Sequence, residues 1–443
     1  MNETSLLPRR QFLKQSIAGA GLLILPSGII SGKTSPNGKL NIALIGAGGR
    51  ATAHFGAVAG ENVVALCDVD ARHLAEAAVK FPNAKHYTDW RKCLEHPGLD
   101  AIVCATTDHT HAHVANWAML RGLSVYCEKP LAIGVEEARV VRATYLANKG
   151  KIATQMGTQL HAGSNYKEIR QLIREGVIGQ LKEVAAWGDR KLPRPGYLPA
   201  AGEPPKHLDY DLWLGPSPFH PYNPGYFAGE APGSNCLSWN MYWDFGSGQV
   251  GDMGSHTMDL AWNAIDADLP TAAEATGDAF NPDVTPVSLA AHFKIPANSW
   301  RPEIKLSWYQ GGAMPQPPTE AAFKGIGHGV MFTGSTGVLV TDYSGSYVII
   351  PHGTPADARL SRKGGKGSFD FQGEWIAACK GGPEASCNFD YSGKMVEMMM
   401  LGLVAYRAGT AITYDPATGK VTNSATADAL IRRKYRDGWK LVG

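Results

Sequence analysis

The chain has 443 residues, and its 42 basic and 40 acidic residues leave a formal net charge of +2. It contains no basic stripe that could follow a phosphate backbone and no ladder of aromatic residues for stacking bases, so nucleic acid is not an expected partner. The length allows two or three domains, and the seven cysteines show no metal-ligand spacing, so no metal site is predicted.

The first 32 residues have the pattern of a targeting segment. A run at 8–14 contains Arg9 and Arg10, and it precedes an apolar run at 17–25 that is too short for a permanent membrane-spanning helix. This pattern is typical of a twin-arginine signal. We therefore expect a periplasmic or otherwise exported protein without a stable membrane anchor, in which a polar linker at 33–38 follows the signal.

Short apolar runs alternate with helical patterns between residues 39 and 156. The runs predict strands at 40–45, 63–67, 101–105, 123–126 and 152–156, and the patterns between them predict helices at 71–80, 112–120 and 135–147. Such an alternation predicts a doubly wound parallel sheet of the Rossmann type.

The pattern changes in the second part of the chain, residues 157–443. Strands are predicted at 183–187, 288–293, 304–309, 330–332 and 338–341, and helices at 166–175, 371–379 and 394–407. These elements favour a second α+β domain with a mostly antiparallel open sheet and helices on one face. The insertion 191–245 is rich in proline, glycine and aromatic residues, and an irregular segment of this length is often functional, so it predicts a wall over a site.

A glycine-rich turn follows the first predicted strand. Its sequence is Gly46-Ala47-Gly48-Gly49-Arg50-Ala51, and Asp68 follows at the end of the second strand. Such glycines let the backbone approach a pyrophosphate at a helix N-terminus, and the carboxylate accepts from ribose hydroxyls and repels a 2′-phosphate. The turn therefore predicts a site for NAD rather than NADP. The alternative is a tight turn on a sheet that binds no nucleotide.

Three further residues are predicted at the carboxyl edge of the same sheet. Thr106, Asp108 and His111 come just after the strand at 101–105, where doubly wound folds bind ligands. We interpret all three as cofactor contacts, and Asp108 suits a helix cap equally well.

Lys129, Asp252 and His256 are the candidates for acid/base chemistry. Lys129 stands in Glu128-Lys129-Pro130 at the end of an apolar strand, where a partly desolvated site is expected to lower its pKa. Asp252 and His256 are four residues apart, so they are predicted to share a helix face on which the carboxylate orients the imidazole as a base. The alternatives are a surface lysine beside a turn and an ordinary capped helix.

Together, the glycine-rich turn, Glu128-Lys129-Pro130 and the Asp252/His256 pair resemble the glucose-fructose oxidoreductase and inositol dehydrogenase family, called Gfo/Idh/MocA. The resemblance covers nearly everything from residue 39 on. It implies that Lys129, Asp252 and His256 surround the carbon that gives a hydride to the nicotinamide, with Glu128 and Lys129 at the cofactor. It also implies a cis peptide bond before Pro130 and a homo-oligomer. The export signal and the aromatic insertion favour an exported, carbohydrate-active branch of the family.

An exported enzyme that keeps its NAD tightly bound has no external nicotinamide pool with which to exchange a reduced cofactor. Redox-neutral chemistry on a small carbohydrate or glycoside is therefore expected. The hypothesis is glycoside cleavage through transient oxidation of a sugar hydroxyl at carbon 3, elimination, water addition and re-reduction. The alternatives are a sugar or polyol dehydrogenase, a two-sugar oxidoreductase giving a keto-sugar or lactone, and a non-catalytic sugar sensor. Expected substrate contacts are Gln159, His161, which is also conceivable as the base at carbon 2, Asp189, Arg190 and Trp243.

Overall fold

The computed structural model of the chain describes residues 38–192, 196–228, 236–365, 367 and 370–442. The predicted signal at 1–32 lies outside the described residues, as does nearly all of the predicted linker. In the part of the chain that is described, no helix combines the length and the apolar character that crossing a bilayer requires.

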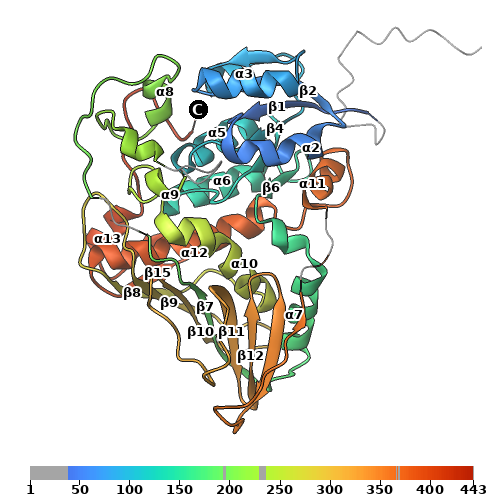
Figure 1. Ribbon diagram of the computed structural model, residues 1–443, viewed down its shortest axis with the longest axis vertical. Helices are drawn as coiled ribbons and strands as arrows, with labels where there is room; N and C mark the ends of the chain where they lie inside the picture. Colours follow the sequence, from blue (N-terminus) through green and yellow to red (C-terminus); the bar gives the residue numbers. More distant parts are fainter. Residues whose placement is uncertain (1–37, 193–195, 229–235, 366, 368–369, 443) are drawn as a thin grey trace, which may run out of the picture. The chain divides into compact units, whose positions relative to one another are not determined.

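A parallel sheet of six strands forms the first part of the structure (Figure 1). Its strand order is β3-β2-β1-β4-β5-β6, and every pairing is parallel. This order reverses between β1 and β4, and ligands bind at such a switch point, beyond the carboxyl ends of the strands. The strands are β1 (Asn41–Ile45), β2 (Asn62–Cys67), β3 (Lys85–Tyr87), β4 (Ala101–Cys104), β5 (Ser124–Cys127) and β6 (Thr154–Met156).

Helices cover both faces of this sheet, which explains why its strands are continuous apolar runs. All residues of β4 and β5 are buried, as expected for strands that are covered on two sides. The helices of this part are η2 (Gly49–His54), α2 (Phe55–Val58), α3 (Ala71–Lys80), α4 (Trp90–Cys93), α5 (Asp108–Leu120) and α6 (Val135–Ala147).

A second sheet of ten strands lies in the other part, in the order β14-β13-β12-β11-β7-β10-β9-β8-β15-β16. Only the β7–β10 pair is parallel among the described pairings of this sheet. The strands are β7 (Leu181–Gly188), β8 (Ala272–Gly277), β9 (Leu289–Ile295), β10 (Ile304–Gln310), β11 (His328–Gly334), β12 (Gly337–Asp342), β13 (Ser346–Pro351), β14 (Lys363–Gly364), β15 (Ile412–Asp415) and β16 (Lys420–Val421).

Two helices lie between the two sheets, α10 (Ser255–Ala264) and α12 (Phe389–Ala408), and α7 (Ser164–Arg174) packs against α10 beside the second sheet (Figure 1). The longest, α12, is apolar nearly all round and packs against α6 on one side and β8 and β9 on the other. A helix with this composition has to be buried on all faces. The smaller helices of this part are η3 (Gln159–Ala162), α8 (Tyr210–Leu214), η4 (Pro224–Phe227), α9 (Cys236–Trp239), α11 (Phe371–Cys379) and α13 (Ala425–Leu430).

The predicted fold class is confirmed, and most predicted strands and helices are found within a few residues. The largest error in a helix boundary concerns α12, which begins at Phe389 rather than near 394. Its start is fixed by Asn388, whose Oδ1 accepts from the backbone N–H of Asp390 (3.0 Å) and of Tyr391 (3.2 Å). The prediction missed the strands β3, β8, β13, β14, β15 and β16. The Lys129–Pro130 peptide bond is cis, as expected.

A buried ion pair joins α6 to α12. Arg139 Nη1 donates to Glu397 Oε1 at 2.7 Å, and Tyr414 Oη donates to the same oxygen at 2.5 Å. The Glu397 side chain is fully buried, whereas Arg139 is 27% exposed. Removing the guanidinium would leave a carboxylate buried without its counter-ion.

We expect Arg139→Ala to lower the free energy of unfolding by about 3 kcal/mol, because breaking a buried pair strands the remaining charge. The measurement is urea unfolding followed by circular dichroism. Arg142→Ala on the same helix is the control. Its partner Asp390 is partly exposed, and the loss should stay below about 1 kcal/mol. Equal losses in the two variants would contradict the prediction.

Candidate active site

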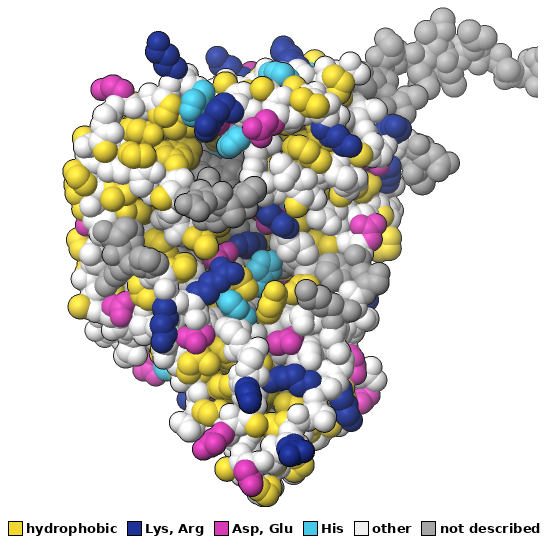
Figure 2. All heavy atoms as spheres, viewed as in Figure 1, with side chains coloured by type: hydrophobic (Ala, Val, Ile, Leu, Met, Phe, Trp, Pro, Cys, Tyr) yellow, Lys and Arg dark blue, Asp and Glu magenta, His cyan; other side chains and the backbone are white. Residues whose placement is uncertain are grey.

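A cavity of about 930 Å³ lies at the carboxyl edge of the parallel sheet, between that edge and the insertion. This volume is within the range of about 300–1,000 Å³ usual for small-molecule sites. In Figure 2 basic, acidic and histidine side chains gather in the hollowed middle of the visible face. The lining includes most predicted site residues: Gly46, Gly48, Gly49, Arg50, Asp68, Thr106, Asp108, His111, Glu128, Lys129, Gln159, Arg190, Asp252 and His256.

The glycine-rich turn is shaped for close approach of an anion. Gly46 has φ +84°, and a Cβ atom there would lie 2.4 Å from the carbonyl oxygen of Ala105. The N–H groups of Ala47 and Gly48 converge on Asp68 Oδ2 at 2.8 and 3.2 Å. These two amides bind the Asp68 carboxylate, which stands at the end of β2 where a ribose would bind, and the close backbone approach at the start of η2 suits a pyrophosphate.

Glu128 connects this turn to the end of β5. Its Oε1 accepts from Arg50 Nε at 3.0 Å and lies 2.9 Å from His54 Nε2. Burial alone would raise the pKa of Glu128, but the hydrogen bond with His54 and the nearby Arg50 hold that pKa well below its usual range. Glu128 is thus a fixed negative charge that positions the helix after the turn. His54, which was not predicted as a site residue, comes from η2 like Arg50, and both contact the same Glu128 oxygen.

His111 links the segments that follow β4 and β5. Its Nδ1 lies 2.7 Å from the carbonyl oxygen of Pro130, and its Nε2 lies 3.0 Å from that of Thr106. Carbonyl oxygens only accept, so both nitrogens carry protons and the ring is cationic. Burial opposes this charge, but Cys104 and Asp108 raise the pKa of His111. His111 therefore positions the segments after β4 and β5 at the lining of the cavity.

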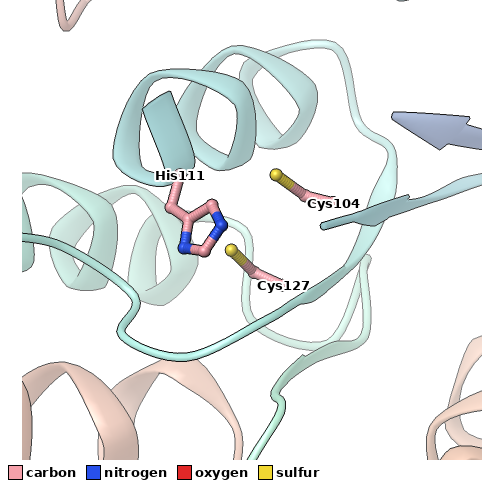
Figure 3. A group of neighbouring side chains, drawn as sticks. All are labelled: Cys104, His111 and Cys127. Atoms are coloured by element: carbon pink, nitrogen blue, oxygen red, sulfur yellow. The ribbon is translucent and has the colours of Figure 1, made fainter. Parts of the chain in front are cut away.

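The two thiols beside His111 come from neighbouring strands (Figure 3). Cys104 and Cys127 are register partners on β4 and β5, and both are fully buried. Although burial would raise it, the hydrogen bond from Cys127 and the charge of His111 lower the pKa of Cys104 to about 6. Because each His111 nitrogen already faces a carbonyl oxygen, this cluster has no imidazole lone pair to offer a metal ion.

Lys129 and Asp252 form the central ion pair of the cavity. Lys129 Nζ donates to Asp252 Oδ1 at 2.5 Å, and Arg190 Nη1 donates to Asp252 Oδ2 at 2.9 Å. Burial would lower the pKa of Lys129, but Asp252 outweighs burial and the pKa is raised. The expected lowering was therefore wrong, because the partner carboxylate lies closer than the sequence could show. The pKa of Asp252 is lowered in turn, chiefly by Lys129 against the effect of burial.

His256 lies beside this pair and is electrically neutral at neutral pH. Burial and the Lys129 ammonium lower the pKa of His256 to about 4, and its Nδ1 is buried without a hydrogen-bond partner among the described residues. A neutral imidazole can accept a proton from a hydroxyl group. Asp108 also lines the cavity, and burial raises the pKa of its carboxyl group to about 7.

The predicted pairing of Asp252 with His256 needs correction. Both carboxylate oxygens of Asp252 bond the cations Lys129 and Arg190, and no bond from Asp252 to His256 is present among the described side chains. Asp252 stands in a π-helical turn, η5 (Val250–Gly254), directly before α10. Such wide turns frequently mark functional sites, and the four-residue spacing of Asp252 and His256 predicts a shared face only in an ordinary α-helix.

Not every predicted substrate contact lies in the cavity. Gln159 and Arg190 line it, whereas Asp189, His161 and Trp243 do not. Trp243 donates from Nε1 to the Asn281 carbonyl oxygen at 3.0 Å. His161 Nδ1 lies 2.8 Å from Asp259 Oδ1 and lines a separate cavity of about 840 Å³ beside α7. Gln159, two residues before His161, lines the active-site cavity instead. Ala51 is buried and does not belong to the lining.

The insertion closes the cavity on the side away from the sheet. We call residues 205–217, which include α8, the roof segment. Its lining residues are Pro205, His207, Leu208, Leu212 and Trp213, and they share the cavity with Asp68, Asp70 and Arg72. Further along, Tyr222, Phe227 and Trp239 line the same space. Their composition predicted a wall, but their individual positions had no local signal in the sequence.

Comparison with known proteins agrees with this geometry. The sequence matches the oxidoreductase family with an NAD-binding Rossmann fold (GFO_IDH_MocA) over residues 40–157, and that family's C-terminal alpha/beta domain over residues 162–288. Inositol 2-dehydrogenase 4 of Saccharopolyspora erythraea is 32% identical over 149 residues, which are 32% of this chain and 44% of that protein. The chain therefore belongs to the Gfo/Idh/MocA family of NAD-binding oxidoreductases.

Levoglucosan dehydrogenase matches both in sequence and in structure. The protein of Pseudarthrobacter phenanthrenivorans is 27% identical over 257 residues, covering 53% of this chain and 54% of that protein. A levoglucosan dehydrogenase structure in complex with NADH and levoglucosan superposes with a TM-score of 0.57 at 18% identity, over 85% of this chain and 99% of that one. The superposition shows a shared fold. The chain spans about half, or less, of the length of these sequence relatives.

We expect Lys129→Met to raise the pKa of His256 from about 4 toward the ordinary histidine value of about 6.5, because the neighbouring positive charge is removed. Nuclear magnetic resonance of the imidazole carbons measures this pKa. In the native protein the folded state binds the His256 proton more weakly than the unfolded chain. The contribution of His256 to stability is therefore present above about pH 6.5 and is lost as pH falls toward about 4.

Lys149→Met is the control for this titration, because Lys149 forms an exposed ion pair with Glu384 and does not line the cavity. It should leave the His256 midpoint in place. An unchanged midpoint in Lys129→Met would show that the ammonium does not control the imidazole.

Proposed function

We propose that this protein is an NAD-dependent enzyme that oxidises a hydroxyl group of a sugar or polyol. One observation carries the proposal: a charged ammonium on Lys129 and a neutral imidazole on His256 line the same cavity as the glycine-rich turn. The family relatives named inositol and levoglucosan dehydrogenases support this substrate class.

The side chains have distinct roles in this proposal. Neutral His256 accepts the hydroxyl proton, and the Lys129 ammonium stabilises the negative charge that develops on that oxygen. Asp252 and Arg190 hold Lys129 in place through the bonds described above. Bound NAD supplies the acceptor for the hydrogen and electron pair that leave the carbon. Asp68 and the glycine-rich turn would hold it.

Glycoside cleavage through transient oxidation at carbon 3 is the second candidate. The covered cavity favours it, because a cofactor that stays bound has to be restored within the same catalytic cycle. This route also requires a base at carbon 2. His161 lines another cavity, so we assign that role to Asp108, whose pKa of about 7 suits proton transfer near neutral pH.

Two further aspects of this proposal rest on sequence and family. The twin-arginine pattern at 1–32 supports export to the periplasm. The family resemblance supports a homo-oligomer. In an exported enzyme that keeps NAD bound, redox-neutral turnover would remove the need for an external nicotinamide pool.

The deciding experiment incubates the purified protein with inositols, anhydrosugars, free sugars and aryl glycosides, and follows NADH and released phenol together. Stoichiometric NADH without phenol identifies a dehydrogenase. Phenol release without net NADH identifies glycoside cleavage. Conversion of one sugar to a lactone while a second sugar is reduced identifies a two-sugar oxidoreductase. Absence of turnover with every class would leave only the sugar sensor and would defeat the proposal.

We expect Lys129→Met and His256→Ala each to lower kcat by about 10²- to 10⁴-fold on whichever substrate is turned over, because the first removes the ammonium that stabilises the developing charge and the second removes the base. NAD content, measured after acid release, should remain that of the native protein. Lys149→Met serves as the matched control and should keep full activity. A sugar sensor would instead retain its response in both site variants, so unchanged function there would refute an enzymatic role for the pair.

A further inference from the structure

Backbone hydrogen bonds connect the roof segment to one side of the nucleotide site. The N–H of Ala71 donates to the carbonyl oxygen of His207 at 2.8 Å, and the N–H of Asp209 donates to that of Val69 at 2.9 Å. These bonds form an antiparallel bridge between Asp70 and Leu208. The bridge begins one residue after Asp68, the carboxylate placed to bind the ribose. One end of the roof segment therefore lies directly beside the ribose position.

The same segment is also fastened to the opposite side of the site. His109, in the first turn of α5, lies with its Nε2 2.9 Å from the carbonyl oxygen of Trp213. A Cβ atom on Gly215 would lie 3.2 Å from the Thr110 methyl group, so the backbone passes close to this turn. The roof segment thus spans from the β2–α3 connection to the start of α5, across the space in which Rossmann folds hold adenosine.

A third contact comes from the C-terminal region, on the outer side of the roof segment. Arg436 Nε donates to the Gly215 carbonyl oxygen at 2.9 Å, and its Nη2 and Nη1 donate to the carbonyl oxygen (2.7 Å) and Oδ1 (2.5 Å) of Asp211. The backbone N–H of Arg436 donates to the Pro216 carbonyl oxygen at 3.0 Å. Arg436 does not line the cavity, so it acts on the segment without touching the cofactor position.

The inner surface of the roof segment suits a flat heteroaromatic ring. Leu208, Leu212 and Trp213 line the cavity with apolar side chains, and Trp213 is held from behind by stacking on Tyr210 with ring centroids 5.5 Å apart. Rings prefer such apolar and aromatic neighbours. The polar groups for the ribose and pyrophosphate come from the opposite side, from Asp68 and the glycine-rich turn.

We propose that the roof segment is the outer wall of the adenosine subsite and that Arg436 keeps it closed. NAD then leaves only when the bonds of the segment open. The proposal depends on NAD binding alone, and its test uses no sugar, so its failure would leave the proposed chemistry untouched. Affinity changes within one site act mainly on the dissociation rate, which is therefore the quantity to measure.

The test compares native protein with Arg436→Ala and Arg436→Lys. NAD retained after prolonged dialysis is measured by acid release, and dissociation is followed by the fluorescence of bound NADH after excess NAD is added. We expect nearly stoichiometric retention in the native protein and dissociation faster by about tenfold or more in Arg436→Ala, a change that corresponds to about 1.4 kcal/mol. Arg436→Lys keeps the charge but loses the forked geometry, so its rate should lie between the two.

Arg432→Ala is the matched control, because Arg432 is a neighbouring arginine that contacts Glu136 and Asp428 rather than the roof segment. It should match the native rate. Hydrogen exchange reports closure independently: the Ala71 and Asp209 amides should lose protection in Arg436→Ala while the strand amides of β1 keep theirs. The proposal is overturned if native protein exchanges NADH within the mixing time. It is equally overturned if folded Arg436→Ala exchanges at the native rate.

Discussion

The ion pair between Lys129 and Asp252 is the contact on which the site depends. The lysine follows β5 of the parallel sheet, the aspartate stands in the π-helical turn before α10, and both are mostly buried, at 17% and 8% side-chain exposure. Neither charge would be stable there alone. The ion pair therefore joins the two sheets and sets the charge of the cavity at the same time. Burial, together with the same ammonium, lowers the pKa of His256 and keeps its imidazole neutral.

Local sequence patterns predicted the parts of the site that are encoded locally. The glycine-rich turn, Asp68 at the end of β2 and Lys129 after β5 each follow a short apolar run, and the parallel order of the strands brings their ends to one edge. The second sheet was predicted less completely. β8 has the sequence Ala-Ala-Glu-Ala-Thr-Gly, most of whose residues have low strand propensity, and β3 has only three residues, two of them exposed. β13 carries an apolar β-branched run between glycine-containing turns, and the prediction overlooked it.

The residues that the sequence could not place are those whose position depends on contacts between distant segments. Asp252 lies 123 residues from Lys129, and only the folded structure shows that it bonds two cations instead of His256. The raised pKa of Lys129 is the direct result. Likewise, Leu208 and Trp213 were visible only as part of a proline- and aromatic-rich insertion. Their place opposite Asp68 depends on backbone bonds to Val69 and Ala71, which no side-chain pattern encodes.

The contact of Arg436 with the roof segment also has a consequence for biosynthesis. Arg436 lies 225 residues after Asp211, so the ribosome releases it long after the parallel sheet and the insertion. Nascent domains fold largely in the order of synthesis. A nucleotide can thus bind between the parallel sheet and the insertion before the proposed closing contact of Arg436 with the roof segment forms.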